Sequence, residues 1–416
     1  MTGLGQPHPL GHDAVQQNLV STPAGRTPKL GEILLLGSLT AFGAVTIDLY
    51  LPALPQIGRS LAASPASVQY TMSAFFVGMA IGQLIYGPVS DRVGRRPALL
   101  FGCVVYVVAS LACAFAPSIE WLIAGRFAQA LGACCGQVLA RAVVRDRYGH
   151  VESARILSLL VLVLAVAPML APAAGGLLIS IASWHATFYV LAAFGVLIGG
   201  AVYFRLVESR SEATAVQARA ESPLRSYLDL LGRRRLVGYI LAGALQGAVL
   251  FSYIASAPEL IINIWGFSPL DFGWLFPVLA VGILGGSQVN RRLLTRYTPD
   301  QVLKVAAVVG VVASLVLVAV AASGAGPLST LIALFAVLST YGFMAANTAA
   351  GALAIDPLRA GATSALIGAS AFGFGALVAT LVGAAHDGTA LPMTVAMAVC
   401  MAGSAAALFG LALPRR

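Results

Sequence analysis

The chain has 416 residues, of which 59% are hydrophobic and only 10% are charged, and its mean hydropathy is +0.88. These values exclude an ordinary soluble domain, in which about a quarter of the residues are charged. The formal net charge of +9 does not require a nucleic-acid partner, because basic loops that face anionic lipid account for it. We therefore predict an integral membrane protein that is embedded in the lipid bilayer.

Apolar stretches of the length that a spanning helix needs, about 20 residues, recur along the whole chain. They are too long for the strands of a membrane β-barrel, and they do not alternate. The sequence thus predicts an all-α membrane protein with twelve transmembrane helices. The expected helices cover residues 31–54, 68–88, 97–116, 120–142, 155–180, 185–206, 236–257, 270–290, 302–322, 327–349, 362–384 and 391–413.

The longest polar interruption separates six of these helices from the other six and shows little apolar periodicity. Two six-helix halves joined by a loop are a common construction for transporters. The expected parts are a cytoplasmic N-terminal tail (1–30), an N-terminal half (31–206), a cytoplasmic central loop (207–235), a C-terminal half (236–413) and a cytoplasmic C-terminus (414–416).

Basic residues indicate the orientation, because Lys and Arg accumulate on the cytoplasmic side of membrane proteins. With a cytoplasmic N-terminus, all 25 lysines and arginines except Arg59 and Arg126 fall in cytoplasmic segments or at cytoplasmic helix ends. We therefore expect both termini in the cytoplasm, and the first apolar stretch is too long for the core of a cleaved signal peptide. The five cysteines lie in predicted helices without zinc-site spacing, so neither a disulfide nor a metal is expected.

A weak internal repeat supports duplication of the halves. The segment after the second helix reads GPVSDRVGRRP, and the segment after the eighth reads GSQVNRRLL. Gly87, Asp91 and Arg92 correspond to Gly286, Asn290 and Arg291, each 199 residues later. The second copy lacks the acid and the two further arginines.

The stretch GPVSDRVGRRPALL (87–100) resembles the signature loop of the major facilitator superfamily, Gly-x-x-x-Asp-Arg/Lys-x-Gly-Arg-Arg/Lys. A glycine at the start lets helices approach closely, one before the arginines permits a tight turn, and the aspartate suits the positive end of a helix. In that superfamily the loop holds the two halves together in the outward-facing state. The resemblance implies a gating role for Gly87, Asp91, Arg92, Gly94, Arg95 and Arg96, with Asp146 as the partner of Arg95. Alternatively, the arginines only set the topology.

Two ionisable side chains of opposite sign interrupt apolar helices. Asp48 lies in VTIDLYLPALP, about six residues from the outer end of the first helix, and Arg126 lies about as deep in the fourth. An arginine there costs about 2.5 to 3.5 kcal/mol on insertion scales, so a partner or a water-filled cavity is expected. We expect Pro52 and Pro55 to break or end the first helix. A static ion pair, or an Arg126 side chain that reaches the outer surface, would explain the same pattern without transport.

The stretch APMLAPAAGG (167–176) resembles a motif of the fifth helix that is found in antiporters of the superfamily and is usually missing from its uptake branches. Proline removes a helical hydrogen bond, and small residues allow close packing. The resemblance implies export and a conformational role for Pro168, Pro172, Gly175 and Gly176.

These motifs, with IDLYLPALPQI (47–57), RDRY (145–148) and AGATSALIGASAFGFGA (360–376), resemble the Bcr/CflA drug-resistance family of drug:proton antiporters. The resemblance implies a twelve-helix major facilitator fold, a bacterial inner-membrane location and export of chloramphenicol-, florfenicol- or bicyclomycin-like compounds. One departure is Thr40, where related multidrug exporters carry a second acid, so a scheme with two carboxylates is not expected.

The predicted mechanism is proton-coupled antiport by a monomer, with Asp48 and Arg126 as the proton-coupling residues. Burial favours the neutral form of a carboxyl group and a nearby arginine favours the charged form, so movement can switch its protonation. No cofactor is expected, because the proton gradient supplies the energy. In the superfamily architecture helices 1, 4, 7 and 10 face the central cavity. The expected substrate-binding residues there are Tyr50, Phe127, Gln129, Gln246, Tyr253, Tyr341 and Asn347.

The nearest alternative is proton-coupled transport of a metabolite such as a nucleoside, an amino acid or a siderophore. An enzyme or a receptor is not expected, because no catalytic cluster, nucleotide-binding loop or large extramembrane domain is apparent in the sequence.

Overall fold

The computed structural model describes residues 30–220 and 222–413. Within these ranges all regular structure is helical, and twelve helical segments are long and apolar enough to cross a membrane. The prediction of a polytopic helical membrane protein is therefore confirmed. Most of the predicted N-terminal tail and the last three residues lie outside the described residues.

Six spans precede the central segment and six follow it. The first group consists of α2 (Leu30–Asp48) with η1 (Leu51–Ala53) and α3 (Leu54–Ser60), α4 (Pro65–Val93), α5 (Arg95–Ala114), α6 (Ile119–Arg147), α7 (His150–Ile181) and α8 (Trp184–Arg205). The second consists of α11 (Arg234–Pro258) with η2 (Glu259–Ile264), α12 (Pro269–Leu293), α13 (Pro299–Ala322), α14 (Pro327–Ser339) with α15 (Tyr341–Ile355), η3 (Pro357–Arg359) with α16 (Ala360–Ala384), and α17 (Leu391–Ala407) with η4 (Leu408–Ala412).

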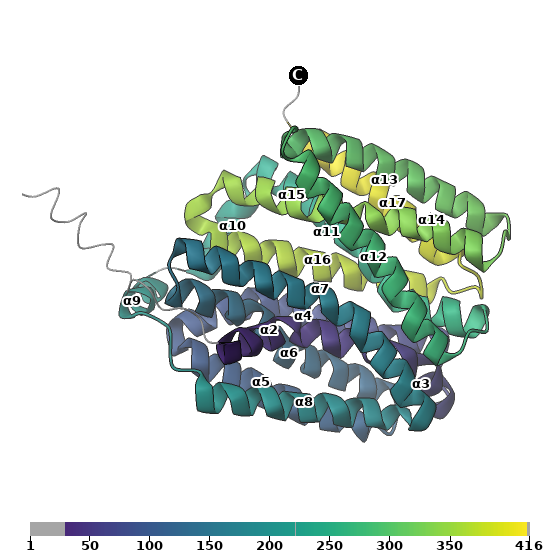
Figure 1. The fold of residues 1–416 in the computed structure, drawn as a ribbon, viewed down its shortest axis with the longest axis horizontal. Coiled ribbons are helices and arrows are strands. Elements are labelled where there is room, and N and C mark those ends of the chain that lie inside the picture. Colours follow the sequence, from purple (N-terminus) through teal and green to yellow (C-terminus); the bar gives the residue numbers. More distant parts are fainter. Residues whose placement is uncertain (1–29, 221, 414–416) are drawn as a thin grey trace, which may run out of the picture.

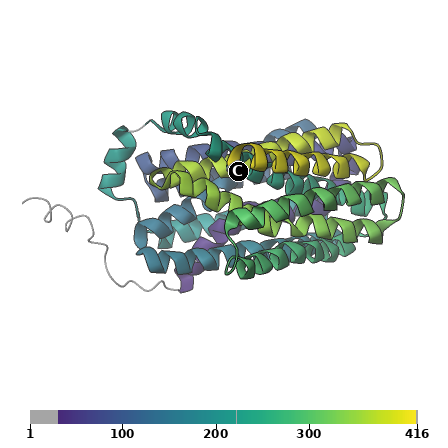
Figure 2. The ribbon, with the colours of Figure 1, turned by 90° about the horizontal axis from the view of Figure 1, so that it is seen from above.

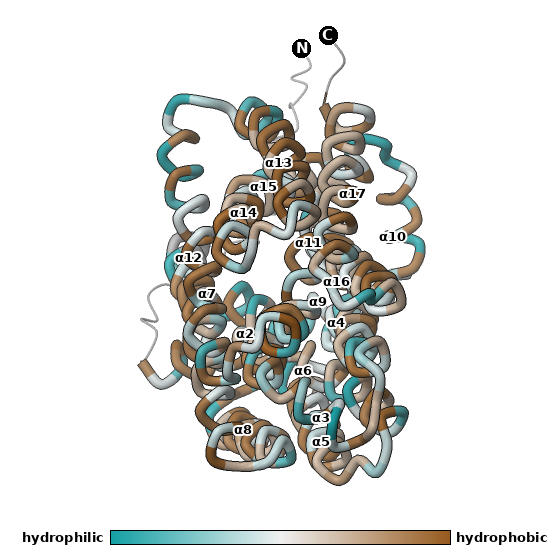
Figure 3. The backbone as a smooth tube through the Cα atoms, turned by 90° about the vertical axis from the view of Figure 1, so that its right-hand side faces the viewer, coloured by the Kyte–Doolittle hydropathy of each residue, from teal (hydrophilic) through white to brown (hydrophobic). Residues whose placement is uncertain are grey.

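The two groups form two packed halves. Figure 1 shows α2 to α8 in the lower part of the bundle and α11 to α17 in the upper part, with all spans running roughly along the long axis. Figure 3, a view along that axis, shows hydrophobic residues over most of the bundle. We call the end that carries α9 (Glu212–Ala220) and α10 (Pro223–Leu231) the basic end, and the other end the opposite end.

Side-chain caps begin several helices in the way that the sequence dictates. Ser64 accepts a hydrogen bond from the backbone N–H of Ser67, and Ser268 forms a capping box with Asp271. Thr298 forms another with Gln301. Each of these caps is followed by proline, which lacks the N–H that would be unsatisfied at a first helical position.

The first span differs from its prediction. It does not end near Pro52 but continues through η1 and α3 to Ser60. The α-helical part ends at Asp48 itself, and Pro52 and Pro55 begin the next short helical pieces instead of terminating the span. Proline is tolerated there because the first positions of a helix do not donate intrahelical hydrogen bonds. Asp48 therefore lies deeper than the sequence indicated.

The central segment also differs from its prediction. It contains two helices, α9 and α10, where the sequence indicated a loop with little apolar periodicity. In α10 the sequence PLRSYLDLL places leucines three and four residues apart, which is helical spacing. The segment is too short for this period to stand out.

Backbone-to-backbone packing joins the halves at the opposite end, between α7 and α12. A Cβ atom on Gly176 would lie 2.5 Å from the carbonyl oxygen of Pro269, and one on Gly273 would lie 2.8 Å from that of Pro172. Only glycine permits such a close approach. The predicted close packing of the small residues in APMLAPAAGG is present, and α7 runs through both of its prolines without interruption.

Side chains add to this contact between the halves. Gln69 of α4 donates a hydrogen bond of 2.9 Å to the hydroxyl of Ser256 in α11. Nearer the centre, the ring of Phe76 packs against Phe251 and Phe372 from the second half, with centroids 4.7 and 6.3 Å away. The halves are thus in contact from the opposite end to the middle of the bundle.

We predict that Gly273→Val separates the halves at the opposite end. Overpacking costs about 1 to 3 kcal/mol, so the labelling rate of a Ser256→Cys thiol with a bulky maleimide in detergent should rise about tenfold. Ser256 is only 7% exposed, and the five native cysteines are buried, so background labelling is low. The matched control is Gly285→Val on the same helix, where a Cβ atom meets no atom within 4 Å. Equal rates in both variants would contradict the prediction.

Candidate functional site

Arg126 lies in the interior of the first half and is fully buried. Its guanidinium group lies over the ring of Tyr50, 4.1 Å from the centroid, and over the ring of Phe75 at 4.3 Å. It donates a 2.7 Å hydrogen bond to the side-chain oxygen of Gln129 and a 3.5 Å bond to the backbone carbonyl of Thr46. Cation–π contacts and neutral acceptors, rather than a carboxylate, thus compensate this charge.

Tyr50 and Gln129 support this arrangement. The Tyr50 hydroxyl is hydrogen-bonded to Thr71 at 2.8 Å, and the Gln129 amide donates to Ser110 at 2.8 Å. Both side chains are fully buried inside the first half. In this structure both side chains contact Arg126 inside the first half, and their predicted role in substrate binding stays a prediction.

Asp48 lies on the other side of the first span. It is 3% exposed, and no described residue donates a hydrogen bond to its carboxyl group. The hydroxyl of Tyr253, from α11 in the second half, lies close enough to feel the charge of this carboxyl group. In the described part of the chain that hydroxyl has no hydrogen-bond partner either.

Asp48 and Arg126 are not joined by an ion pair within the described residues. The Thr46 hydroxyl faces the interior of the first half, where it is hydrogen-bonded to Tyr106 at 2.7 Å. Two residues along an α-helix correspond to a rotation of about 200°, so Asp48 must face away from that interior. The sequence indicated a similar depth for both charges but did not reveal that a helix separates them, and the static ion pair is excluded.

In the second half, the two predicted substrate-binding residues on α11, Gln246 and Tyr253, are both buried. The ring of Tyr253 stacks on Phe276 with centroids 5.2 Å apart. Gln246 donates a 3.1 Å hydrogen bond to Thr340, while its side-chain oxygen has no partner among the described residues. Both side chains thus keep an unused polar atom in the interior of the protein.

The other predicted contact residues differ in their roles. Phe127 and Tyr341 are half-buried. Asn347 donates a 2.9 Å hydrogen bond to Asn290, the residue equivalent to Asp91 in the repeat. Asn347 therefore holds α15 against α12, which is a packing role.

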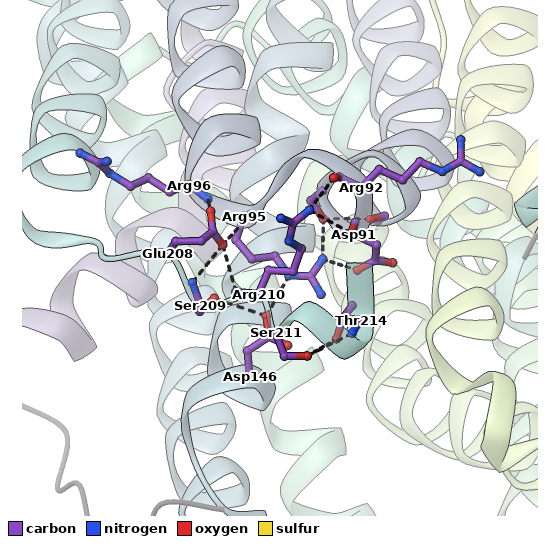
Figure 4. A network of polar contacts seen from close by, with 12 residues as sticks. Asp91, Arg92, Arg95, Arg96, Asp146, Glu208, Ser209, Arg210, Ser211 and Thr214 are labelled. Carbon is purple, nitrogen blue, oxygen red and sulfur yellow. Dashed lines mark hydrogen bonds and ion pairs between the residues drawn. The ribbon is translucent and has the colours of Figure 1, made fainter. Parts of the chain in front are cut away.

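The signature loop forms an ionic network at the basic end of the first half (Figure 4). Arg95 pairs with Asp91 at 2.5 Å and with Asp146 at 2.9 Å, and it donates to the hydroxyl of Ser90 at 2.6 Å. The predicted contact with Asp146 is present. Arg95 thereby ties α5 to α4 and α6, because charged partners make strong hydrogen bonds.

The central segment completes this network through two residues that the sequence analysis missed. Glu208 accepts hydrogen bonds from the backbone N–H groups of Arg95 at 2.9 Å and Arg96 at 3.2 Å, so it caps the start of α5. Arg210 donates to the backbone carbonyls of Asp91 and Arg92 at the end of α4. An acid at a helix start and a base at a helix end both complement the helix dipole.

This arrangement corrects two expectations. The carboxylate at the helix start is that of Glu208, whereas Asp91 pairs with Arg95. A Cβ atom on Gly87 would meet no atom within 4 Å, so this glycine does not mediate a close approach here. Gly94 does form the tight turn, with φ of +111°. The remaining arginines bind backbone carbonyls, Arg92 that of Ala218 and Arg96 that of Tyr203.

A cleft of about 200 Å³ lies at the opposite end between the halves. Gln69, Arg59 and Glu259 contribute its polar lining. Asp48 is not among the described residues that line it. Gln69, which lines this cleft, also donates the hydrogen bond to Ser256 in the second half.

A family model of the major facilitator superfamily matches residues 34–380 of the chain. The chain is 36% identical over 397 residues to the uncharacterised transporter YdgK of Bacillus subtilis, covering 94% of this chain and 98% of that protein. It is 30% identical to the bicyclomycin resistance protein homolog of Haemophilus influenzae, with 89% and 93% covered. The multidrug resistance protein MdtL of Klebsiella pneumoniae is 31% identical, with 65% and 68% covered.

Solved structures share the fold. A D-xylose–proton symporter matches with a TM-score of 0.70 and 14% identity, covering 91% of this chain and 95% of that one. The nucleoside transporter NupG matches with a TM-score of 0.72 and 12% identity, covering 91% and 98%. At such low identity the likeness concerns the fold alone.

Gln129→Leu should destabilise the protein, because it removes an acceptor from a buried guanidinium. We expect a loss of about 2 to 3 kcal/mol, measured by thermal unfolding in detergent. The matched control is Gln137→Leu on the same helix, whose partner is the neutral, buried Gln83. It should cost about 1 kcal/mol. Equal losses would show that Arg126 does not depend on Gln129.

Glu208→Ala should destabilise the network at the basic end in a pH-dependent way. Partial burial raises the pKa of Glu208, but the backbone N–H groups, led by that of Arg210, outweigh burial and hold the pKa below its usual value. The stabilisation is therefore present above the ordinary glutamate pKa and is lost as the pH falls through the lower native pKa. We expect a loss of about 1 kcal/mol at pH 7 that shrinks as the pH falls below the ordinary glutamate pKa of about 4.3.

The control for this experiment is Glu212→Ala, which removes an exposed carboxylate four residues further along. This substitution should leave the unfolding temperature almost unchanged, both at pH 7 and at acidic pH. A Glu208→Ala loss that did not depend on pH would contradict the capping role.

Proposed function

Because the chain belongs to the major facilitator superfamily, we propose that it exports drug-like small molecules in exchange for protons. The printed names of its relatives, a bicyclomycin resistance protein homolog and a multidrug resistance protein, support efflux of drugs such as bicyclomycin-like or chloramphenicol-like compounds. The single observation that carries the proton coupling is Asp48, a buried carboxyl group at the boundary between the halves that has no counter-ion among the described residues.

Asp48 is suited to carry the exchanged proton. A carboxyl group that is removed from water without a counter-ion favours its neutral form, and access to water favours its charged form. Asp48 faces the second half, so a change in the contact between the halves changes its solvation. Thr40, at the position of a possible second acid, donates its hydroxyl to the carbonyl of Leu36 and carries no charge. We therefore propose coupling through a single carboxylate.

Arg126 has a supporting role in this proposal. Its guanidinium remains charged and holds Tyr50 and Gln129, and through the Thr46 carbonyl it holds the face of α2 opposite to Asp48. Arg126 therefore positions the first span. The residues that we propose to contact substrate are above all Tyr253, which lies near Asp48, and Gln246, which lies seven residues away on the same face of α11.

Alternating access would exchange one set of contacts for another. In the described conformation the halves meet at the opposite end through Gly176, Gly273 and the Gln69–Ser256 hydrogen bond. Their separation would expose Asp48 and its substrate to that side. The signature loop, tied within the first half here, is then free to contact the second half, as the resemblance implies.

We also propose that the basic end is cytoplasmic, that both termini lie there, and that the protein works as a monomer in the bacterial inner membrane. The clustering of arginines at that end supports the orientation. The proton gradient then drives transport without a cofactor. One proton moving through 100 mV supplies about 2.3 kcal/mol, which sustains a gradient of about fiftyfold for a neutral drug.

Asp48→Asn should abolish proton-coupled export. In inverted membrane vesicles with an acidic interior, added drug should release protons from vesicles that contain the wild-type protein and not from those with the variant. The matched control is Asp387→Asn, which changes an exposed aspartate in the loop before α17 and should keep full activity. A variant at Asp48 that retained proton release would disprove the assignment.

Growth assays then decide the substrate class. Cells that express the protein should tolerate chloramphenicol, florfenicol or bicyclomycin better than cells that express Asp48→Asn. If no drug gives protection while a nucleoside, an amino acid or a siderophore elicits proton release, the protein is a metabolite transporter.

A further inference from the structure

The short helix α10 in the central segment has three different faces. Tyr227 and Leu230 pack against the transmembrane helices, and Leu230 is fully buried. Arg225 and Asp229 lie on a polar face. The third face carries Leu224, Leu228 and Leu231, which are 67%, 60% and 46% exposed. This nine-residue helix thus exposes three of its four leucines.

α10 touches both halves of the protein, through Tyr227 on its packed face and through Asp229 on its polar face. The hydroxyl of Tyr227 donates a 3.0 Å hydrogen bond to the carbonyl of Leu84 in α4, in the first half. The carboxylate of Asp229 pairs with Arg359, at the start of α16 in the second half, at 3.3 Å. α10 is therefore held at a fixed place on the side of the bundle, where Figure 3 shows it at the periphery.

The exposed residues of α4 beside α10 indicate how deep α10 lies relative to the apolar surface of the bundle. Beyond Leu84, toward the basic end, Ile85 and Val89 of α4 are still apolar and are 48% and 40% exposed. A spanning helix exposes such residues where it faces lipid. Leu358, next to the partner of Asp229, is 99% exposed as well. The exposed leucines of α10 thus lie at a level where the surrounding surface is apolar.

Positive charge borders this leucine stripe. Arg225 lies on the adjacent face of α10 and is exposed, and it makes no ion pair with any residue in the described ranges. Arg233, Arg234 and Arg235 follow directly and remain exposed. Leucines on one helix face beside arginines on the next are the pattern of helices that lie in a membrane interface. Each basic side chain near an anionic surface adds attraction.

We propose that α10 is a membrane-surface helix whose Leu224, Leu228 and Leu231 insert into the leaflet at the basic end, while Arg225 binds the headgroups of anionic phospholipids. The occupant of this face is the lipid bilayer. Since Tyr227 and Asp229 of the same helix contact the two halves, lipid composition acts on the segment that connects them. The inference does not depend on which molecule the protein transports.

The test uses bimane attached to Leu228→Cys in protein reconstituted into phosphatidylcholine vesicles with about 30% phosphatidylglycerol. The native thiols are buried, so the label reports on one site. Lipids with a nitroxide near the headgroup should quench this bimane at least about threefold more than bimane on Ser226→Cys, on the opposite face. Aqueous iodide should show the reverse order.

The contribution of charge is measured with Arg225→Gln in the Leu228→Cys background. The fraction of phosphatidylglycerol needed for half-maximal lipid quenching should rise about fivefold, which corresponds to about 1 kcal/mol for one arginine. An unchanged fraction would overturn the role of Arg225 in headgroup binding.

Two further outcomes overturn the proposal as a whole. If iodide quenches position 228 as strongly as position 226, the leucine face lies in water. If neither lipid nitroxide nor iodide reaches position 228, another protein surface covers it. Neither readout requires transport, so a failure of the proposed efflux function would leave this test intact.

Discussion

A single guanidinium group, buried in the first half without a carboxylate partner in the described chain, determines how that half is built. Taking such a charge out of water costs several kcal/mol, and the cost must be offset locally because Arg126 cannot lose its proton. Two aromatic faces, one amide oxygen and one backbone carbonyl provide the compensation. These groups come from the first span and from α4 and α6, so the charge holds three helices in one arrangement.

The same arrangement explains where Asp48 lies. Since the Thr46 carbonyl and the Tyr50 ring face Arg126, the residue between them must point the opposite way, toward the second half. The α-helix also ends at this residue, and the span continues through a short 3₁₀ turn. The separation of the two charges thus follows from helix geometry, and it leaves the carboxyl group dependent on the contact between the halves rather than on a fixed counter-ion.

The sequence predicted those features that depend on one segment alone, such as the position of a spanning helix. Lipid requires a minimum length and an apolar surface of every spanning helix separately. The sequence therefore predicted all twelve spans, and most of the predicted helix ends lie within a few residues of the observed ones. The Arg95–Asp146 contact was also predictable, because the family resemblance covers both the signature loop with Arg95 and the RDRY stretch with Asp146. Glu208 and Arg210 were missed, since their roles depend on where the chain returns after α8. The depth of Arg126 was anticipated, but its aromatic partners and the direction of Asp48 required the angles between helices.

The two copies of the repeat differ in a way that bears on movement. At the basic end the first half is fixed by charge-assisted bonds around Arg95, whereas the second half has the neutral pair Asn290 and Asn347 at the equivalent place. α10 touches both halves, through one neutral hydrogen bond to α4 and one half-exposed ion pair to Arg359. Each of these contacts is worth only about 1 kcal/mol or less. If α4 and α16 separate at this end, either the hydrogen bond of α10 to α4 or its ion pair with Arg359 must break. Because each contact is weak, it can break and form again in every transport cycle.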